Sequence, residues 1–247
     1  ITGANVPKSN FSDAPFWGEL TTVLDFAKAN VTSTLCACLA THAALKYFYD
    51  IDRVKLDTKR WGVFPHRAPR GLHPLIRNVN TRFDVPHSRF NDIPARSFTE
   101  KSLPILVESS EAGVHLALSE DGFRFVFFQG HPEYDRNSLL KEYKREVLRF
   151  IKGELTHYPP LPTHYADHKA QEFARKFEKE VLGNPAAKAL AASFPEEAML
   201  TGIDNTWGDS ARSIFHNWIG LVYQLTNLDR KRPFMEGIDP NDPLQIR

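Results

Sequence analysis

Residues 32–49 read TSTLCACLATHAALKYFY and join a predicted strand directly to a predicted helix. The first six residues are β-prone, whereas Leu39–Tyr49 is rich in alanine and leucine and favours a helix. Cys38 lies at the junction, the geometry of a nucleophile elbow. A thiol at the start of a helix feels oriented N–H groups and the positive end of the dipole, which favour the thiolate, and the same N–H groups can hold an oxyanion. Most free cysteines are small buried hydrophobes, and Cys36, within the predicted strand, fits that description.

A second candidate feature is His131-Pro132-Glu133, which follows the apolar run Phe125–Phe128. We expect these side chains at the carboxyl end of a strand, the edge of an open α/β sheet where active sites collect. An imidazole can accept the thiol proton, and a carboxylate can orient the imidazole and stabilise its cation. Taken alone, the segment would fit an exposed turn. Together with Cys38 it predicts a Cys/His/Glu triad.

Alternating patterns along the chain predict an α/β fold with a mostly parallel, doubly wound sheet covered on both faces. Glu120-Asp121-Gly122 is a hairpin signal between two of the predicted strands. Asp135 is a candidate N-cap for the helix that follows it. The predicted helices cover about 14–30, 39–49, 135–151, 167–183 and 209–225, and the further predicted strands are 61–65, 105–108, 114–119 and 123–128.

The bulk composition excludes several function classes. The 247 residues hold 31 Lys+Arg and 30 Asp+Glu, so a net charge of +1 gives no field that would attract nucleic acid or a membrane surface. No apolar run is long enough to cross a bilayer, and two cysteines two residues apart indicate a reducing compartment. We therefore expect a cytoplasmic protein without nucleic-acid or membrane partners. No cluster has the spacing of a zinc site, so we expect no metal and no cofactor.

Several blocks, in order and at nearly constant spacing along the whole chain, resemble the homoserine O-acyltransferases, a family related to class I glutamine amidotransferases. The most specific of them is QGHPEYD at 129–135. The other blocks are ITGA (1–4), TSTLCAC (32–38), WGVFPHR (61–67), HPLIRNVNTRFDVPHSRF (73–90), LLKEYKREV (139–147) and ARSIFHNWIGLVYQLT (211–226). The resemblance implies a flavodoxin-like fold of the glutamine amidotransferase type with an added C-terminal helical region.

Carried over by position, the resemblance implies that Cys38 accepts the acyl group of an acyl-CoA, that His131 is the base and that Glu133 orients it. L-homoserine, the acceptor, would then open the acyl-enzyme in a ping-pong reaction of methionine biosynthesis. The family's substrate-binding arginines fall on Arg89 and Arg145, whose planar guanidinium groups suit an α-carboxylate. His87 and Ser88 are expected beside them in the same pocket.

In the family that the chain resembles, the acyl donor is indicated by a residue in the loop after ITGA. There the family has glutamate in acetyl-specific members and glycine in succinyl-specific ones, whereas this chain has Pro7. Proline fills volume and fixes φ, which favours acetyl-CoA. The adjacent Lys8 could instead pair with a succinyl carboxylate, so succinyl-CoA remains the alternative donor, and serine or a related amino acid an alternative acceptor.

Two other functions stay open, a glutaminase of the amidotransferase type and an inactive paralogue. Ala37 and Leu39 flank Cys38 where glutaminase elbows usually carry glycines, which counts against glutaminase activity. We expect residues 1–155 to form the catalytic core and 156–247 a helical extension packed on it. A segment that supplies the first strands is expected to be missing before Ile1. A homodimer is expected.

Overall fold

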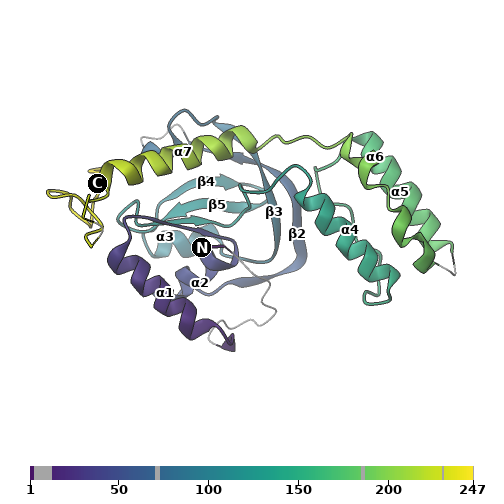
Figure 1. Cartoon of the computed structure of the whole chain (residues 1–247), viewed down its shortest axis with the longest axis horizontal. Coiled ribbons are helices and arrows are strands. Elements are labelled where there is room, and N and C mark those ends of the chain that lie inside the picture. Colours follow the sequence, from purple (N-terminus) through teal and green to yellow (C-terminus); the bar gives the residue numbers. More distant parts are fainter. Residues whose placement is uncertain (3–12, 70–72, 185–186, 230, 247) are drawn as a thin grey trace.

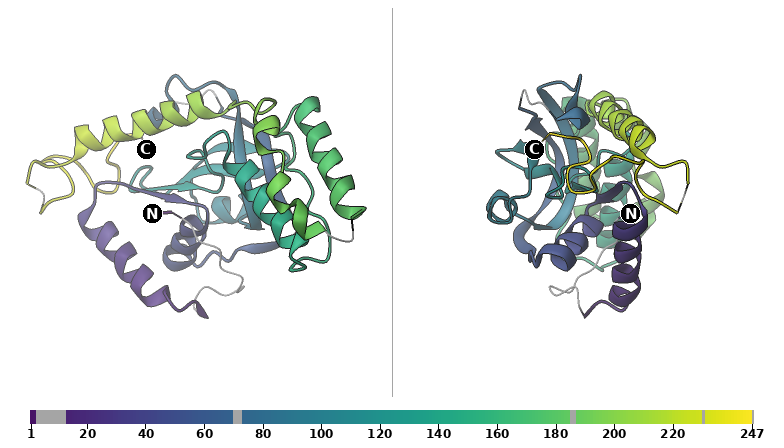
Figure 2. Two further views of the ribbon diagram at one scale, coloured as in Figure 1. Left: turned by 45° about the vertical axis from the view of Figure 1, so that its right-hand side comes forward. Right: turned by 90° about the vertical axis from the view of Figure 1, so that its left-hand side faces the viewer.

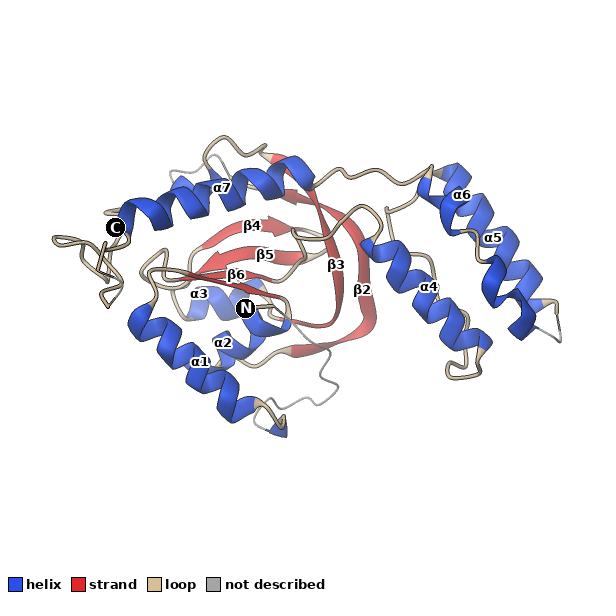
Figure 3. Ribbon diagram, viewed as in Figure 1, coloured by secondary structure: helices blue, strands red, loops and turns tan. Residues whose placement is uncertain are grey.

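The computed structural model describes residues 1–2, 13–69, 73–184, 187–229 and 231–246. Its centre is a six-stranded sheet in the order β1-β6-β5-β4-β2-β3. The strands are β1 (Thr34–Ala37), β2 (Val54–Arg67), β3 (Arg82–Asp92), β4 (Ile105–Ser109), β5 (Gly113–Leu118) and β6 (Phe125–Phe128). β2 and β3 are long and strongly bent, so the sheet curls around one side of the molecule (Figure 3).

The sheet is mixed, so the expectation of a mostly parallel, flavodoxin-like sheet is wrong. Among the six strands of the described residues, β1 and β6 pair in parallel, while β2–β3, β2–β4, β4–β5 and β5–β6 all pair antiparallel. The reason is the length of the connections, because a parallel crossover needs a dozen or more residues. The connections from β4 to β5 (residues 110–112) and from β5 to β6 (residues 119–124) are much shorter, so these neighbours pair antiparallel; the short helix α3 (Ala95–Glu100) lies between β3 and β4. The predicted hairpin at Glu120-Asp121-Gly122 is confirmed as the β5–β6 turn.

Helices cover both faces of the sheet, as predicted. On one face lie α1 (Trp17–Asn30), α2 (Leu39–Tyr49) and α3, and on the other lies α7 (Gly208–Leu225) with the short helix η2 (Pro74–Ile76) (Figure 1). Side chains in β6 alternate between the two cores. Phe125 and Phe127 join the core under α1–α3, whereas Val126 and Phe128 join the core under α7. This two-residue period is that of a strand buried on both faces.

A separate helical group consists of α4 (Ser138–Ile151), α5 (His168–Leu182), η3 (Ala187–Ser193) and α6 (Glu196–Leu200). Helices α4, α5 and α6 lie together in every view (Figures 1 and 2). The predicted i+4 series Leu139, Tyr143, Val147 and Ile151 forms the buried face of α4. The N-cap of α4 is Asn137, not the expected Asp135.

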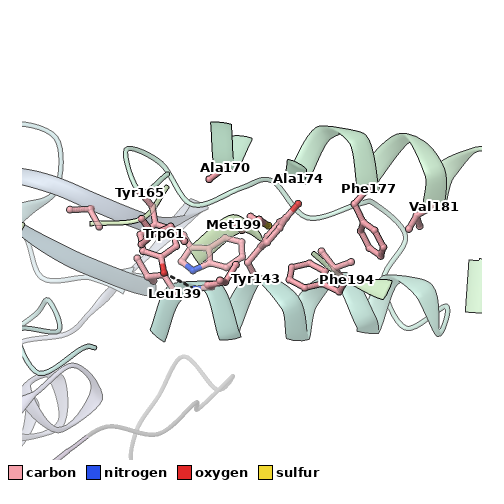
Figure 4. Close-up of a cluster of buried hydrophobic side chains, with 14 of the residues drawn as sticks. Trp61, Leu139, Tyr143, Tyr165, Ala170, Ala174, Phe177, Val181, Phe194 and Met199 are labelled. Atoms are coloured by element: carbon pink, nitrogen blue, oxygen red, sulfur yellow. Dashed lines mark hydrogen bonds between the residues drawn. The ribbon is translucent and has the colours of Figure 1, made fainter. Parts of the chain in front are cut away.

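The core of this helical group is aromatic (Figure 4). The ring centroid of Phe194 lies 5.9 Å from that of Tyr143 and 5.4 Å from that of Phe177. Trp61 of β2 belongs to the same cluster and connects it to the sheet. Helix α4 packs with α5 and α6, whereas α7 packs on the sheet. The chain after residue 155 therefore contributes both to the helical group and to the cover of the sheet. The division into a core of 1–155 and an extension of 156–247 stays a prediction.

Within the described ranges, every helix is too short or too polar to cross a membrane.

Candidate active site

Cys38 lies in a tight turn between β1 and α2, the predicted elbow. Its φ of 52° and ψ of −114° are unusual for a residue other than glycine. The turn is tied to β6, because both the Cys38 N–H and the Thr41 hydroxyl donate to the carbonyl oxygen of Phe128, each at 2.8 Å. Cys38 is partly exposed, whereas Cys36 is buried. Burial raises the pKa of the Cys36 thiol to about 12, which fits the expected packing role.

His131 is held at the end of β6 by its backbone. Its N–H donates to the carbonyl oxygen of Pro86 at 2.8 Å, which ties it to β3. The preceding Gly130 passes so close to its neighbours that a Cβ there would lie 2.6 Å from Val85 Cγ1 and 2.9 Å from His115 Nδ1. A glycine is therefore required for the chain to bring His131 to the elbow.

The predicted triad residues come together. His131 Nδ1 lies 2.8 Å from Glu133 Oε1, and Cys38 and His131 line the same cavity. Burial alone would lower the pKa of His131, but the hydrogen bonds to Cys38 and Glu133 and the negative charges of both outweigh it and raise the pKa to about 9. The Tyr134 ring stacks on the imidazole with centroids 4.2 Å apart. In its protonated form, the imidazolium, the His131 ring is thus placed to stabilise a thiolate.

Cys38 and His131 open into a cavity of about 400 Å³. It lies where α2, β3 and α4 meet, and residues from all three line it. Besides Cys38 and His131, its lining includes Leu39, His42, Arg53, Lys59, Ser88, Arg89, Glu133, Tyr134, Glu142 and Arg145.

Glu142 is the centre of a polar network that the sequence did not indicate. Its carboxylate accepts hydrogen bonds from Ser88 Oγ at 2.6 Å and Tyr134 OH at 2.7 Å, and Lys59 Nζ lies 3.2 Å away. Burial would raise the pKa of Glu142, but these three partners lower it, so the carboxylate is ionised. Ser88, a predicted site residue, faces the cavity as expected.

The two predicted arginines differ in environment. Arg145 Nε contacts Glu146 at 3.0 Å, and its side chain is 62% exposed at the rim of the cavity. The Arg89 side chain is only 2% exposed and donates to Asp92 Oδ1 at 2.5 Å and to the Ala112 carbonyl oxygen at 2.6 Å. Arg89 lines the cavity, but most of its donors are already used. Both arginines remain predictions as substrate ligands.

Two other expectations concern neighbouring residues. His87 is fully buried and is not part of the cavity lining, so the expectation that it lies in the pocket is wrong. It packs against His66 and His115 instead, with ring centroids 5.1 and 6.1 Å away. Pro7 and Lys8 lie outside the described residues.

The chain matches the family description of homoserine O-succinyltransferase over residues 1–228. It is 52% identical over 246 residues to the homoserine O-succinyltransferase of Methylobacter tundripaludum, covering 100% of this chain and 70% of that protein. It is also 52% identical to the homoserine O-succinyltransferase of Nitrosococcus oceani over 247 residues, with 100% and 69% covered.

The chain belongs to the homoserine O-succinyltransferase family. The expected resemblance to the homoserine O-acyltransferases is therefore confirmed. A solved structure of a glutamine amidotransferase from Methylobacillus flagellatus is similar in fold, with a TM-score of 0.51 and 14% identity, covering 87% of this chain and 73% of that one. At that identity the likeness concerns the fold alone, and it agrees with the expected relation to class I glutamine amidotransferases.

Sequence reasoning missed Lys59, Glu142, His42 and Arg53 as members of the cavity. A signal existed for Glu142, because it precedes Arg145 by three residues on a predicted helix and the two must share a face. Within the described ranges no group of three or more His, Cys, Asp or Glu side chains could hold a metal ion.

Proposed function

We propose that this chain transfers the succinyl group of succinyl-CoA to the hydroxyl of L-homoserine in methionine biosynthesis, through a thioester on Cys38. The observation that carries the proposal is the position of Cys38 at the elbow, in one cavity with a His131 ring that Glu133 holds from Nδ1. The names of the similar proteins support the substrates.

In the first half-reaction the Cys38 thiolate attacks the thioester carbonyl carbon of succinyl-CoA. The oxyanion faces the start of α2, where the first N–H groups have no acceptor within the helix. Cys38 N–H is already used by Phe128, so the N–H of Leu39, which lines the cavity, is the better donor. The carbon–sulfur bond to CoA breaks, and the CoA thiolate takes the proton of the His131 imidazolium.

In the second half-reaction His131 acts as the base. Acylation removes the negative charge of the thiolate and its hydrogen bond, both of which raise the pKa of His131 in the free enzyme. The pKa of the imidazole therefore falls when the thioester forms, and the neutral ring can accept the proton of the homoserine hydroxyl. The homoserine oxygen bonds to the succinyl carbon, Cys38 leaves as a thiolate, and the original ion pair with His131 is restored.

The acceptor is held on the α4 side of the cavity. Glu142 and Arg145 are three residues apart on one helix and line the same cavity. An ionised carboxylate and a guanidinium at that spacing match the ammonium and carboxylate groups of an amino-acid zwitterion. Lys59 and Tyr134 hold Glu142 in place, which leaves the hydroxyl arm of homoserine to extend towards Cys38.

The donor differs from the sequence-based expectation. Pro7 was taken to favour acetyl-CoA, but the family description and the similar proteins are named for succinyl transfer, which favours the alternative. A single loop residue is weak ground for a donor, because other lining residues can supply the recognition. Succinyl-CoA is therefore the proposed donor.

The test is a thiol-release assay with the purified protein and L-homoserine. Succinyl-CoA should give a kcat/KM at least about tenfold above that of acetyl-CoA, since that ratio defines specificity. L-serine and L-glutamine serve as comparison substrates, and ammonia release from glutamine would favour the glutaminase alternative. Activity with acetyl-CoA alone would overturn the proposed donor.

A further inference from the structure

Gln129 is a fully buried residue at the end of β6 that joins β5, the segment after β3 and α2. Its amide nitrogen donates to the carbonyl oxygens of Ile93 and Val114 at 2.9 and 3.0 Å. Its amide oxygen accepts from the N–H of Ile93 at 2.8 Å and lies 2.9 Å from His42 Nε2. Because carbonyl oxygens can only accept, the amide nitrogen must face them, which fixes the orientation of the amide group.

The Gln129 amide also decides the tautomer of His42. The amide oxygen can only accept, so His42 Nε2 must carry the proton and donate to it. Burial lowers the pKa of His42 to about 4, so the ring is neutral at neutral pH. The other nitrogen of the neutral ring, Nδ1, therefore presents a lone pair and can only accept a hydrogen bond.

His42 Nδ1 reaches the cavity that Cys38 and His131 line. The residue is only 3% exposed, yet it is part of the cavity lining. Nδ1 forms no hydrogen bond with the described residues, and it is not one of the fully buried polar atoms that lack a partner. This nitrogen therefore keeps access to the cavity. A buried ring with an unused acceptor at a cavity wall indicates a hydrogen-bond donor on a ligand.

The His42 ring lies one helical turn from the reacting sulfur. Cys38 is the N-cap of α2, and the His42 N–H donates to the Cys38 carbonyl oxygen at 3.2 Å. Residues four apart share one face of a helix and are about 6 Å apart along its axis. Side chains in a helix lean towards its N-terminus, so we expect the His42 ring on the side of Cys38. A ligand group a few bonds beyond the sulfur that Cys38 attacks then comes within reach of Nδ1.

The substrates of the proposed reaction offer few donors for this acceptor. The succinyl group has only acceptors, and the Nδ1 lone pair would repel its carboxylate. The homoserine hydroxyl gives its proton to His131, and the ammonium group is assigned to Glu142 on α4. The CoA arm carries an amide N–H two methylene groups from its sulfur, and this N–H is the nearest donor that has no other assigned partner.

We infer that His42 Nδ1 accepts a hydrogen bond from the amide N–H of CoA nearest the thioester and so positions the acyl donor for attack by Cys38. The inference rests on the proposed function and adds a binding residue for the donor. A hydrogen bond between neutral groups is expected to contribute about three- to tenfold in kcat/KM.

The experiment compares succinyl-CoA with an analogue in which oxygen replaces that amide N–H. The wild type should prefer succinyl-CoA by about three- to tenfold in kcat/KM. His42→Leu removes both ring nitrogens and should lose this preference. His42→Gln can still donate to Gln129 and accept from the acyl donor, so it should keep most of the preference.

The ratio of the two donors is measured within each variant, so a partly unfolded variant still gives a usable result. His168→Leu, at an exposed histidine of α5 outside the cavity lining, is the matched control and should keep the wild-type ratio.

Each outcome decides one question. No turnover of succinyl-CoA by the wild type would contradict the proposed function itself. Equal use of the two donors by an active wild type would overturn the His42 assignment, as would a preference that survives in His42→Leu. A rise in the KM for homoserine in His42→Leu, with the donor preference unchanged, would also overturn it and would place the ammonium group of the acceptor at Nδ1.

Discussion

His131 Nδ1 lies 2.8 Å from Glu133 Oε1, and the other face of the site is set by Tyr134, whose ring stacks on the imidazole with centroids 4.2 Å apart. The pair is held by backbone as much as by side chains, since Gly130 fits between β3 and β5 and the His131 N–H bonds to Pro86. The imidazole is therefore fixed in position before any substrate binds.

Replacing Glu133 with glutamine should lower the pKa of His131 from about 9, because one of the two negative partners is removed. Less of the imidazole is then protonated at neutral pH, so the thiolate is less stabilised. The titration of the His131 ring, followed by NMR, should move to lower pH, and kcat should fall at least about tenfold. Glu154→Gln, an exposed carboxylate outside the cavity lining, is the control. An unchanged titration of His131 in Glu133→Gln would exclude the orienting role.

Arg145→Ala should raise the KM for homoserine much more than the KM for the acyl donor. Because the side chain is 62% exposed, the loss should be about 1–2 kcal/mol in acceptor binding. Arg149→Ala removes an arginine one turn further along α4 that also contacts Glu146, and it should leave both KM values unchanged. Equal changes in the two KM values of Arg145→Ala would indicate a structural role.

Gly130→Ala should destabilise the protein by about 1–3 kcal/mol, because the added methyl group overlaps Val85 and His115. The displaced backbone also moves His131, so the activity should fall by more than the loss of folded protein accounts for. Gly18→Ala is the matched control, since a Cβ there meets nothing within 4 Å and alanine favours the α1 helix. Urea unfolding and initial rates of both variants check the contrast, and an equally stable, active Gly130→Ala would refute the close approach.

The buried histidine group should make the protein sensitive to acid. Burial lowers the pKa of His66 to about 4 and holds those of His87 and His115 well below the usual value. These rings are neutral when folded but bind protons when unfolded below about pH 6.5. The free energy of unfolding should therefore be fully maintained above that pH and should fall as the pH drops towards 4.

His115→Phe tests this directly, since both ring nitrogens of His115 are buried and have no hydrogen-bond partner among the described residues. The variant should lose less free energy of unfolding than the wild type between pH 6.5 and 4, measured by urea denaturation at each pH. Identical slopes in the two proteins would mean that other groups control the acid transition.

Sequence and structure agree best at the elbow. Cys38, His131 and Glu133 could be placed because a strand–helix junction and a strand end are local patterns. The direction of strand pairing could not be predicted from the sequence, because it depends on which strands meet in the fold. Strand β3 was missed because Pro86 and the charged residues around it hide the alternation of apolar and polar residues. The spacing of Glu142 from Arg145 was a local signal, but the network around Glu142 could not be predicted, since its partners Lys59 and Ser88 come from other elements.

The most direct test of the central claim is mass spectrometry of the protein after brief mixing with succinyl-CoA in the absence of homoserine. Cys36 and Cys38 fall on the same peptide, so the measurement includes fragment ions and the Cys36→Ala variant. We expect one succinyl group on Cys38, present in Cys36→Ala, absent in Cys38→Ala and discharged on addition of homoserine. A succinyl group on Cys36 with Cys38 unmodified, or turnover in Cys38→Ala, would contradict the account.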